Sequence, residues 1–518
     1  RDAVTLRHAK AGRSGLAATV FVPAMQRGKY TSDCSGEAFT LLQLLFLNNM
    51  LGYADRTNLS VAVIAMSREL GWGEASTGTL LASFFCGYVL TQIPAGLAAA
   101  RFGAKRVLLI GTVVWSAATV LTPWAARQSI DAALAARVVV GLAEGVQIPC
   151  CNALLAAWVP PQGRARALSF IFSGQFVGTI CALSCSPLAE WWWPSIFLLW
   201  GWLGFVWCLV FAALAPASSP GASAGKGAAG EELGLIPAVD GSGSPRCSAS
   251  APRCARPAFL AHPAFLAVCA AHFANNWGAY LLLSWLPKYL TSLGATLADG
   301  STLFSTPYAV AIVADNVGGW VADEVLLSRC RLKLLHARKC MQAVAMLVPC
   351  GCFLLLCGST SAGGATALLA AAIAASSWSH AGYAANILDL AGGDAATAAQ
   401  MWGVVNTIGT VPGIAANVVT GRVLAAAPTA AAGWVRVFST GAAIYVCGLT
   451  AFLALAQALP LPTSGAEKAG SCGTGAVLGP NPIPKPATRE ESEVTRRIAL
   501  SRDVPRETRG IPHGRVFL

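Results

Sequence analysis

The sequence predicts an all-α membrane protein, and three observations lead to that fold class. Of the 518 residues, 55% are hydrophobic and only 12% are charged, about half of the roughly 25% found in typical globular chains. Apolar windows of about 20 residues, the length that crosses a bilayer as a helix, recur along the chain. A stretch rich in Gly, Ser, Ala and Pro divides these windows into two equal sets. This composition excludes a disordered chain, a nucleic-acid-binding module and an ordinary soluble enzyme.

Twelve apolar windows are expected to be membrane helices. They cover residues 40–66, 77–100, 106–126, 131–158, 166–190, 194–215, 263–290, 301–325, 340–358, 363–388, 397–426 and 434–458. The first six form a predicted N-terminal bundle over 40–215, and the last six form a C-terminal bundle over 258–458. Between them, residues 216–257 have the composition of a flexible linker.

The two ends of the chain are polar and differ in charge. Residues 1–39 form a basic tail, with six Lys or Arg against one acid in the first 30 residues; this indicates either a transit-peptide remnant or a basic cytoplasmic tail. Residues 459–518 are polar and interrupted by prolines, and we expect them to be disordered. Alternate connections between the windows hold fourteen Lys or Arg against about five on the other side. Both termini are therefore expected to face the cytosol, or the stroma in a plastid.

The two halves of the chain echo each other. The windows that begin at Thr40 and Pro263 are separated by 223 residues, and Gly96–Arg101 is followed at the same offset by Gly319–Glu324. Six helices, a linker and six helices are typical of a carrier that rocks two bundles around a central site.

Ionisable residues inside the apolar windows are the main functional signal. A charge at the bilayer centre costs at least about 2.5–3.5 kcal/mol and is retained mainly where it lines a cavity and has a partner. Window 40–66 contains Asp55 and Arg56, and window 131–158 contains Arg137 and Glu144. Later windows contain His272, Asp315 and His380. For these last three, hydrogen bonding within the bundle is an equally open explanation.

The spacing of the two charged residues in the fourth window, 131–158, suggests that each binds a different ion. Arg137 and Glu144 lie seven residues apart, about two helical turns or 10 Å along one face. Gly141 lies between them and predicts a notch on that face. An arginine can bind a carboxylate or phosphate with two parallel hydrogen bonds, while a buried glutamate can bind and release a cation. The alternative is that Asp55 and Arg137 form a buried pair that only joins two helices.

Uncharged polar residues at helical spacing add further candidates. Tyr88 precedes Gln92 by one turn, and Gln175, Tyr280 and Asn406 lie in other windows. Hydrogen bonding between helices is the alternative explanation for such residues.

Five segments together resemble the anion:cation symporter branch of the major facilitator superfamily. They are Tyr53–Ser60, Ser83–Pro94, Arg137–Pro149, Asn276–Pro287 and Asn406–Gly413. The resemblance covers about residues 40–458 and implies the major facilitator fold, with twelve transmembrane helices in two six-helix bundles. It also implies that Arg56 and Arg137 engage an anion, that Asp55 and Glu144 take part in proton coupling, and that Gln175 lies in the substrate pocket.

Some residues of this sequence differ from the family motifs, and these differences help to indicate which members of the family it is most similar to. Ala100 stands where the loop after the second helix normally has Asp, which predicts that a latch between the bundles is weakened or replaced. Gly163-Arg164 replaces the usual Glu-Arg. Asn275 and Leu81 stand where vesicular glutamate carriers have Arg and His, which argues against that subtype. The chain is most similar to plant and algal plastid phosphate (anion) transporters.

The sequence therefore predicts a secondary active transporter that moves an anion, inorganic phosphate first, together with Na⁺ or H⁺ by alternating access. The predicted substrate-binding residues are Arg56, Arg137, Tyr53, Tyr88, Gln175, Tyr280 and Asn406, and the predicted ion-coupling residues are Asp55 and Glu144. The alternatives are a carrier of ascorbate, a dicarboxylate or a sugar acid, or an uncoupled anion channel or sensor. No enzymatic activity, metal, cofactor or nucleic-acid partner is predicted, and a monomer in the lipid bilayer is expected. A plastid envelope or thylakoid location is expected, with the plasma membrane or another endomembrane as alternatives.

Overall fold

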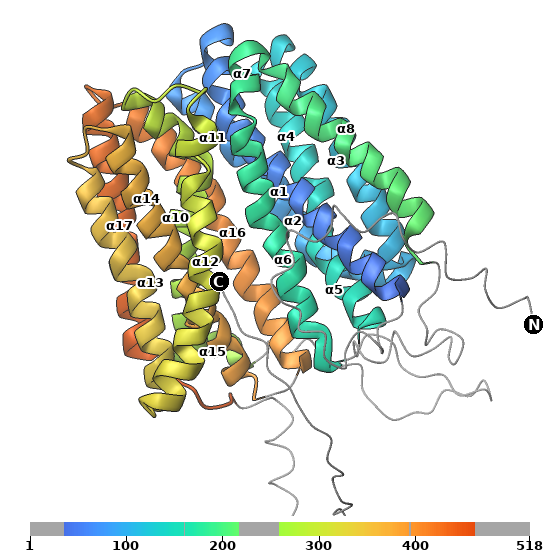
Figure 1. Ribbon diagram of the computed structural model, residues 1–518, viewed down its shortest axis with the longest axis vertical. Helices are drawn as coiled ribbons and strands as arrows, with labels where there is room; N and C mark the ends of the chain where they lie inside the picture. The colour runs from blue at the N-terminus through green and yellow to red at the C-terminus, as the bar shows by residue number, and fades with distance from the viewer. Residues whose placement is uncertain (1–35, 160, 217–257, 393–394, 462–518) are drawn as a thin grey trace, which may run out of the picture. The chain divides into compact units, whose positions relative to one another are not determined.

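Helices are the regular elements throughout residues 36–159, 161–216, 258–392 and 395–461, which are the residues that this computed structural model describes (Figure 1). They belong to one compact unit that ends at Thr463. Most of the predicted basic tail, the linker after residue 216 and the tail after residue 461 lie outside the described residues. The predicted division into two bundles stays a prediction.

The first half of the chain contains eight α-helices. These are α1 (Gly36–Leu70), α2 (Glu74–Phe102), α3 (Ala104–Gln128), α4 (Ile130–Glu144), α5 (Gln147–Trp158), α6 (Pro161–Ser184), α7 (Ser186–Trp192) and α8 (Pro194–Leu214). Gly71 (φ 71°) follows α1 and Gly103 (φ 88°) separates α2 from α3, because glycine adopts the left-handed conformations that stop a helix. α2 is bent by 53° at Pro94, since proline removes a helical hydrogen bond.

The second half contains interrupted helices as well as long ones. Its elements are the 3₁₀-helix η1 (Ala258–Ala261), α10 (Pro263–Ser292), α11 (Gly300–Leu303), α12 (Thr306–Trp320), the π-helix η2 (Val321–Arg329), α13 (Leu334–Leu356), α14 (Ala362–Ser377), the 3₁₀-helix η3 (Trp378–His380), α15 (Tyr383–Leu390), α16 (Ala395–Ala425) and α17 (Ala430–Leu455). π-Helical turns and 3₁₀ segments inside a long helix often occur at functional sites.

Eight helical segments of the described chain are long and apolar enough to cross a membrane, and nine are when the bent α2 counts as one span. The eight segments are Ala104–Gln128, Ile130–Trp158, Ala167–Trp192, Pro194–Leu214, Leu334–Leu356, Ala362–Leu390, Gln400–Ala425 and Ala430–Leu455. Helices α1 and α10 are 35 and 30 residues long, beyond the roughly 20 that a span requires, but they do not meet the same apolar criterion. The multi-pass, all-helical class is therefore confirmed, while the count of twelve remains a prediction.

Glycines allow the helix backbones to pack closely around the charged residues of α1 and α4. Gly174 and Gly178 on α6 face the backbone of α1, where Cβ atoms would collide with the carbonyl groups of Phe46 and Met50. Small residues at helix contacts are typical of membrane bundles. α2 packs against α4 and also against α16 of the second half. The region between α1, α2, α4 and α16 is thereby brought together from both halves.

Candidate functional site

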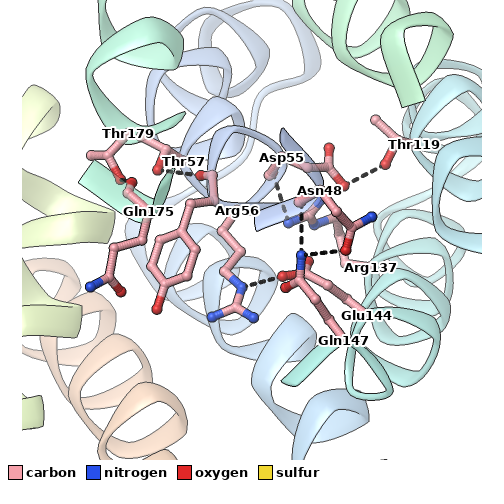
Figure 2. A network of polar contacts seen from close by, with 11 residues as sticks. Asn48, Asp55, Arg56, Thr57, Thr119, Arg137, Glu144, Gln147, Gln175 and Thr179 are labelled. Atoms are coloured by element: carbon pink, nitrogen blue, oxygen red, sulfur yellow. Dashed lines mark hydrogen bonds and ion pairs between the residues drawn. The ribbon is translucent and has the colours of Figure 1, made fainter. Parts of the chain in front are cut away.

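Four charged side chains from two helices of the first half lie buried near one another (Figure 2). Asp55 and Arg56 come from α1, and Arg137 and Glu144 come from α4. Their exposed fractions are 3%, 8%, 1% and 0%, respectively. Burying four ionisable groups at membrane depth is costly, so this cluster is the first place to look for function.

Arg56 is held by one carboxylate and three aromatic rings. Its Nε donates to Oε1 of Glu144 at 2.5 Å. The centre of its guanidinium lies 4.6 Å from the ring centroid of Tyr53, 5.0 Å from that of Phe84 and 4.5 Å from that of Tyr88. Cation–π contacts of this kind stabilise a desolvated guanidinium. The arginine therefore keeps its charge and a fixed position without a second carboxylate.

Glu144 reaches Arg56 because α4 ends at Glu144 and because α1 has a glycine opposite its side chain. α4 ends at Glu144 and α5 begins at Gln147, with Gly145 and Val146 forming a turn between them. On α1, a Cβ atom at Gly52 would lie 3.0 Å from Oε1 of Glu144 and 2.9 Å from Nε2 of Gln147. Only glycine at position 52 leaves room for these two side chains against α1.

Asp55 and Arg137 do not form the direct ion pair considered as an alternative above. Nη2 of Arg137 donates to the backbone carbonyl of Asp55 at 3.5 Å. The carboxylate of Asp55 instead accepts from Nδ2 of Asn58 at 2.9 Å and from Oγ1 of Thr119 at 2.6 Å. Across the described residues, no carboxylate oxygen lies within 4.0 Å of a nitrogen of Arg137. The charge of Arg137 is thus buried without a contacting counter-charge.

Several polar atoms of the cluster have no hydrogen-bond partner among the described residues. They are Nε and Nη1 of Arg137, Nη2 of Arg56 and Oε2 of Glu144, all of which are buried. Buried donors and acceptors are nearly always satisfied, and an unsatisfied charged group is expensive. Three cationic N–H donors and one carboxylate oxygen are suited to an anion and a proton, respectively.

The predicted notch at Gly141 is wrong. A Cβ atom there would collide with the backbone carbonyl of Phe84 on α2, and Gly87 of α2 likewise faces the carbonyl of Val138 on α4. The two glycines let α2 and α4 pack backbone to backbone. The space beside Gly141 is filled by α2 and offers no room for a ligand.

Three of the predicted tyrosines surround the Arg56 side of the cluster. Tyr53 and Tyr88 contact the guanidinium directly, and Tyr280 of α10 packs against Phe85 of α2 with ring centroids 4.6 Å apart. A phenol hydroxyl can donate a hydrogen bond, so an anion that reaches Arg56 would meet such donors beside the guanidinium.

The remaining two predicted residues lie at the edges of this region. Gln175 is half-buried on α6, and in Figure 2 its side chain extends in the same direction as that of Arg56. Asn406 of α16 donates to Oε1 of Gln92 at 3.1 Å, and Nε2 of Gln92 donates to Thr410 at 3.0 Å. Asn406 thus joins α16 to α2. The assignment of Gln175 and Asn406 to substrate binding stays a prediction.

The sequence analysis missed the amide network behind Glu144. Nε2 of Gln147 donates to the backbone carbonyl of Asn48 at 2.8 Å and to its Oδ1 at 3.1 Å, and Nδ2 of Asn48 donates to Thr112 at 3.2 Å. The network ties α5 to α1 and α3 directly beside Gly52. The available signal was that Gln147 follows Glu144 by three residues and so shares its helical face.

A multi-helix bundle with interrupted helices and a cluster of buried charges is typical of membrane transporters. The chain belongs to the Major Facilitator Superfamily, whose family model matches residues 45–417. The resemblance described above is confirmed by relatives that are plastid anion transporters.

Three curated relatives illustrate that relationship. "Probable anion transporter 4, chloroplastic" of Oryza sativa subsp. japonica is 34% identical over 416 residues, covering 79% of this chain and 67% of that protein. "Ascorbate transporter, chloroplastic" of Arabidopsis thaliana is 33% identical, covering 79% and 73%. "Sodium-dependent phosphate transport protein 1, chloroplastic" of Arabidopsis thaliana is 32% identical, covering 79% and 77%. The relatives are transporters and not enzymes.

Solved structures agree on the fold. A bacterial homolog to the human lysosomal transporter Spinster, in an inward-facing and occupied conformation, gives a TM-score of 0.61 at 17% identity and covers 80% of this chain and 96% of that chain. A D-xylose-proton symporter gives 0.61 at 13% identity, covering 82% and 98%. At these identities the likeness concerns the fold alone.

Proposed function

We propose that the protein is a secondary active transporter that moves inorganic phosphate together with a proton across a plastid membrane. The single observation that carries the proposal is the guanidinium of Arg56, which is held at membrane depth between the carboxylate of Glu144 and three aromatic rings. Arg137, buried behind it without a contacting carboxylate, supplies further N–H donors. Arginine suits phosphate because its planar fork makes paired hydrogen bonds and stays charged.

Coupling of anion transport to proton transport follows because Glu144 and the anion compete for Arg56. While Glu144 is ionised, it occupies Nε of Arg56, and an arriving anion meets a neutral pair. When Glu144 takes up a proton, the carboxylate charge disappears and Arg56 becomes available to the anion. Release of the anion and of the proton on the other side restores the ion pair. Asp55, held by Thr119 and Asn58, keeps a negative charge near Arg137 through the cycle or shares in the proton binding.

Two relatives support alternatives on the same scaffold. The name of the Arabidopsis sodium-dependent phosphate transport protein favours Na⁺ as the coupling ion, and the name of the Arabidopsis ascorbate transporter favours an organic anion as substrate. A plastid location is supported by the chloroplastic relatives and by the basic residues at the start of the sequence.

Uptake of labelled phosphate into proteoliposomes tests the proposal. We expect accumulation when an inward proton gradient is imposed, no additional accumulation with a sodium gradient, and weak competition by excess ascorbate or dicarboxylate. If only the sodium gradient drove uptake, the coupling ion would be Na⁺. If ascorbate displaced phosphate at equal concentration, the substrate would be an organic anion. Equilibration without accumulation under either gradient would indicate a channel.

Two substitutions locate the binding site. Charge-assisted hydrogen bonds contribute about 1.5–3 kcal/mol, so Arg137→Ala is expected to reduce phosphate uptake about 10- to 150-fold. Arg56→Lys keeps the charge but removes the fork and should also raise the phosphate concentration needed for half-maximal uptake. The matched control is Arg127→Ala, which removes a surface arginine that contacts Glu69 at 3.4 Å. Normal uptake by correctly folded Arg56→Lys and Arg137→Ala proteins would refute the assignment.

A further inference from the structure

The second half of the chain contains an interrupted span that matches the one beside Glu144. Ile130–Trp158 and Ala362–Leu390 are both 29 residues long, and each is broken just past its middle. In the first span, Glu144 is the last residue before the break. In the second, His380 is the last residue of the short 3₁₀-helix η3 at the break. Interrupted membrane helices mark the binding sites of transporters.

His380 is paired with a carboxylate from a neighbouring helix. Its Nδ1 lies 2.8 Å from Oδ1 of Asp315 on α12. Trp378, two residues before His380, donates from Nε1 to the carbonyl of Ala314 at 2.9 Å, and its ring lies where a side chain at Gly318 would be. η3 is therefore fixed against α12 on both sides of the pair. The backbone segments that carry Asp315 and His380 are thus fixed relative to each other, so the contact does not depend on two flexible side chains alone.

The pair is accessible, unlike the charged cluster of the first half. The side chain of His380 is 54% exposed and that of Asp315 is 34% exposed. His380 lies in the apolar span Ala362–Leu390 and Asp315 in the predicted apolar window 301–325, and exposure of a charge to hydrocarbon is unfavourable by at least about 2.5–3.5 kcal/mol. The exposed side of the pair therefore faces water. α12 also contacts α6 of the first half.

Few other charges act on His380. α14 has no charged residue, and the described side chains of α6 have none. Arg338 of α13 donates to the carbonyl of Ala381 at 3.3 Å, but its charge is matched by Asp389 of α15 at 2.9 Å. His272 of α10 is buried, and its Nδ1 contacts the hydroxyl of Tyr383 at 2.5 Å.

The charged residues of η2, the π-helix that follows α12, lie farther from His380. Asp323, Glu324 and Arg329 of η2 begin eight residues beyond Asp315, about 12 Å along the helix axis. Asp315 is thus the carboxylate that contacts His380 in the described part of the chain.

We propose that Asp315 and His380 form a second proton-binding site, located in the second half of the chain. With Nδ1–H donating to Asp315, Nε2 of the imidazole is free to accept a proton from water. Uptake of one proton converts a neutral imidazole and a carboxylate, with a charge of −1, into an imidazolium–carboxylate pair with no net charge. Release of the same proton to water restores the first state. Proton binding at the pair stands by itself, whereas its effect on transport rests on the proposed function.

Proton binding can be measured without any transport. Diethyl pyrocarbonate acylates neutral, accessible imidazoles, and mass spectrometry of the reconstituted full chain reports the reaction of each histidine separately. Within about pH 5 to 8, where imidazole titrates, His380 should react progressively faster as pH rises. In Asp315→Asn the protein loses the charge that holds the proton, so His380 should react severalfold faster than in the wild type at the acidic end. The exposed His336 of α13 is the internal control and should react equally in both proteins.

Two results would overturn the site. If His380 stays unreactive at every pH while His336 reacts, the pair does not face water. If the reaction of His380 has the same pH dependence in the wild type and in Asp315→Asn, the two residues do not share a proton.

The role in transport needs a second readout. His380→Gln is expected to retain phosphate counterflow, which requires binding and exchange by the loaded carrier but no driving ion gradient. It should flatten the pH dependence of gradient-driven uptake, whereas His336→Gln should leave that dependence unchanged. An unaltered pH profile in His380→Gln would exclude a role in coupling. Absence of any phosphate transport by the wild type would remove the proposed function but leave the acylation result to decide the proton site.

Discussion

Replacing Glu144 by Gln separates anion binding from proton coupling. The amide has the shape of the carboxylate and keeps one carbonyl oxygen for Nε of Arg56, which now lies 2.5 Å from Oε1. It cannot take up or release a proton. The variant therefore mimics the protonated transporter permanently, with Arg56 available to phosphate. We expect counterflow of labelled phosphate to persist in Glu144→Gln and accumulation driven by a proton gradient to be lost.

The energetic consequence can be worked out from the same contact. A hydrogen bond to a charged group contributes about 1.5–3 kcal/mol, and the amide of Gln keeps such a bond to the charged guanidinium. Both side chains of the pair are at most 4% exposed, so solvent screening is weak. Glu144→Gln should therefore lower the free energy of unfolding by about 1–2 kcal/mol, which is the loss expected when the partner is removed entirely less the hydrogen bond that the amide keeps. Glu144→Ala removes the partner entirely and should cost about 3–5 kcal/mol.

Denaturant unfolding in detergent and uptake in proteoliposomes together test this reasoning. The control is Glu69→Gln, which alters a 47% exposed carboxylate that contacts Arg127 and also accepts from Nε1 of Trp193 at 2.6 Å. The amide oxygen of Gln can keep the bond to Trp193, so accumulation and stability should be nearly unchanged. The reasoning is refuted if Glu144→Gln accumulates phosphate against its gradient as the wild type does. It also fails if Glu144→Gln and Glu144→Ala are equally stable.

Two further predictions follow from the packing. Gly52→Ala places a methyl group 3.0 Å from Oε1 of Glu144. The resulting overpacking should lower the free energy of unfolding by about 1–3 kcal/mol and reduce uptake. The control is Gly351→Ala, where nothing lies within 4 Å, and it should be neutral or slightly stabilising in the same unfolding measurement. Lys288 on α10 lies 2.6 Å from Glu74 on α2 with side chains 18% and 36% exposed; a partly exposed pair contributes about 0.2–1 kcal/mol. Lys288→Ala should therefore increase the population in which α2 and α10 separate by about 1.4- to 5-fold, as measured by double electron–electron resonance between labels on these two helices. An unchanged distance distribution would contradict the expectation that this pair stabilises the contact between α2 and α10.

Hydropathy predicted the helices well but not their interruptions. The window 131–158 corresponds to α4 and α5 together, and the window 363–388 corresponds to α14, η3 and most of α15. Composition reports whether a segment is apolar enough to cross a membrane, and a turn such as Gly145-Val146 barely changes that average. The breaks arise because polar side chains and neighbouring helices satisfy the freed backbone groups, which is tertiary information.

The residues of the site were predictable, but their pairing was not. A charge in an apolar window is visible in the sequence, and so Asp55, Arg56, Arg137 and Glu144 could be singled out. Periodicity places two residues on one face of one helix but does not say which helix faces them. For this reason Arg56 was not matched with Glu144, and Gly141 was assigned to a ligand although it accommodates α2.

The contacts of the charged cluster also constrain how the transporter switches. The protein contacts of Arg56, Glu144 and Asp55 come from α1, α2, α3 and α4 within the described chain. Those helices belong to the first half, so a rigid movement of one half against the other leaves the Arg56–Glu144 bond intact. Movement of the halves can change access to Arg56 and can bring Tyr280 toward it or away from it. Breaking the ion pair therefore requires a local event, and the arrival of a proton at Glu144 is the event that the geometry provides.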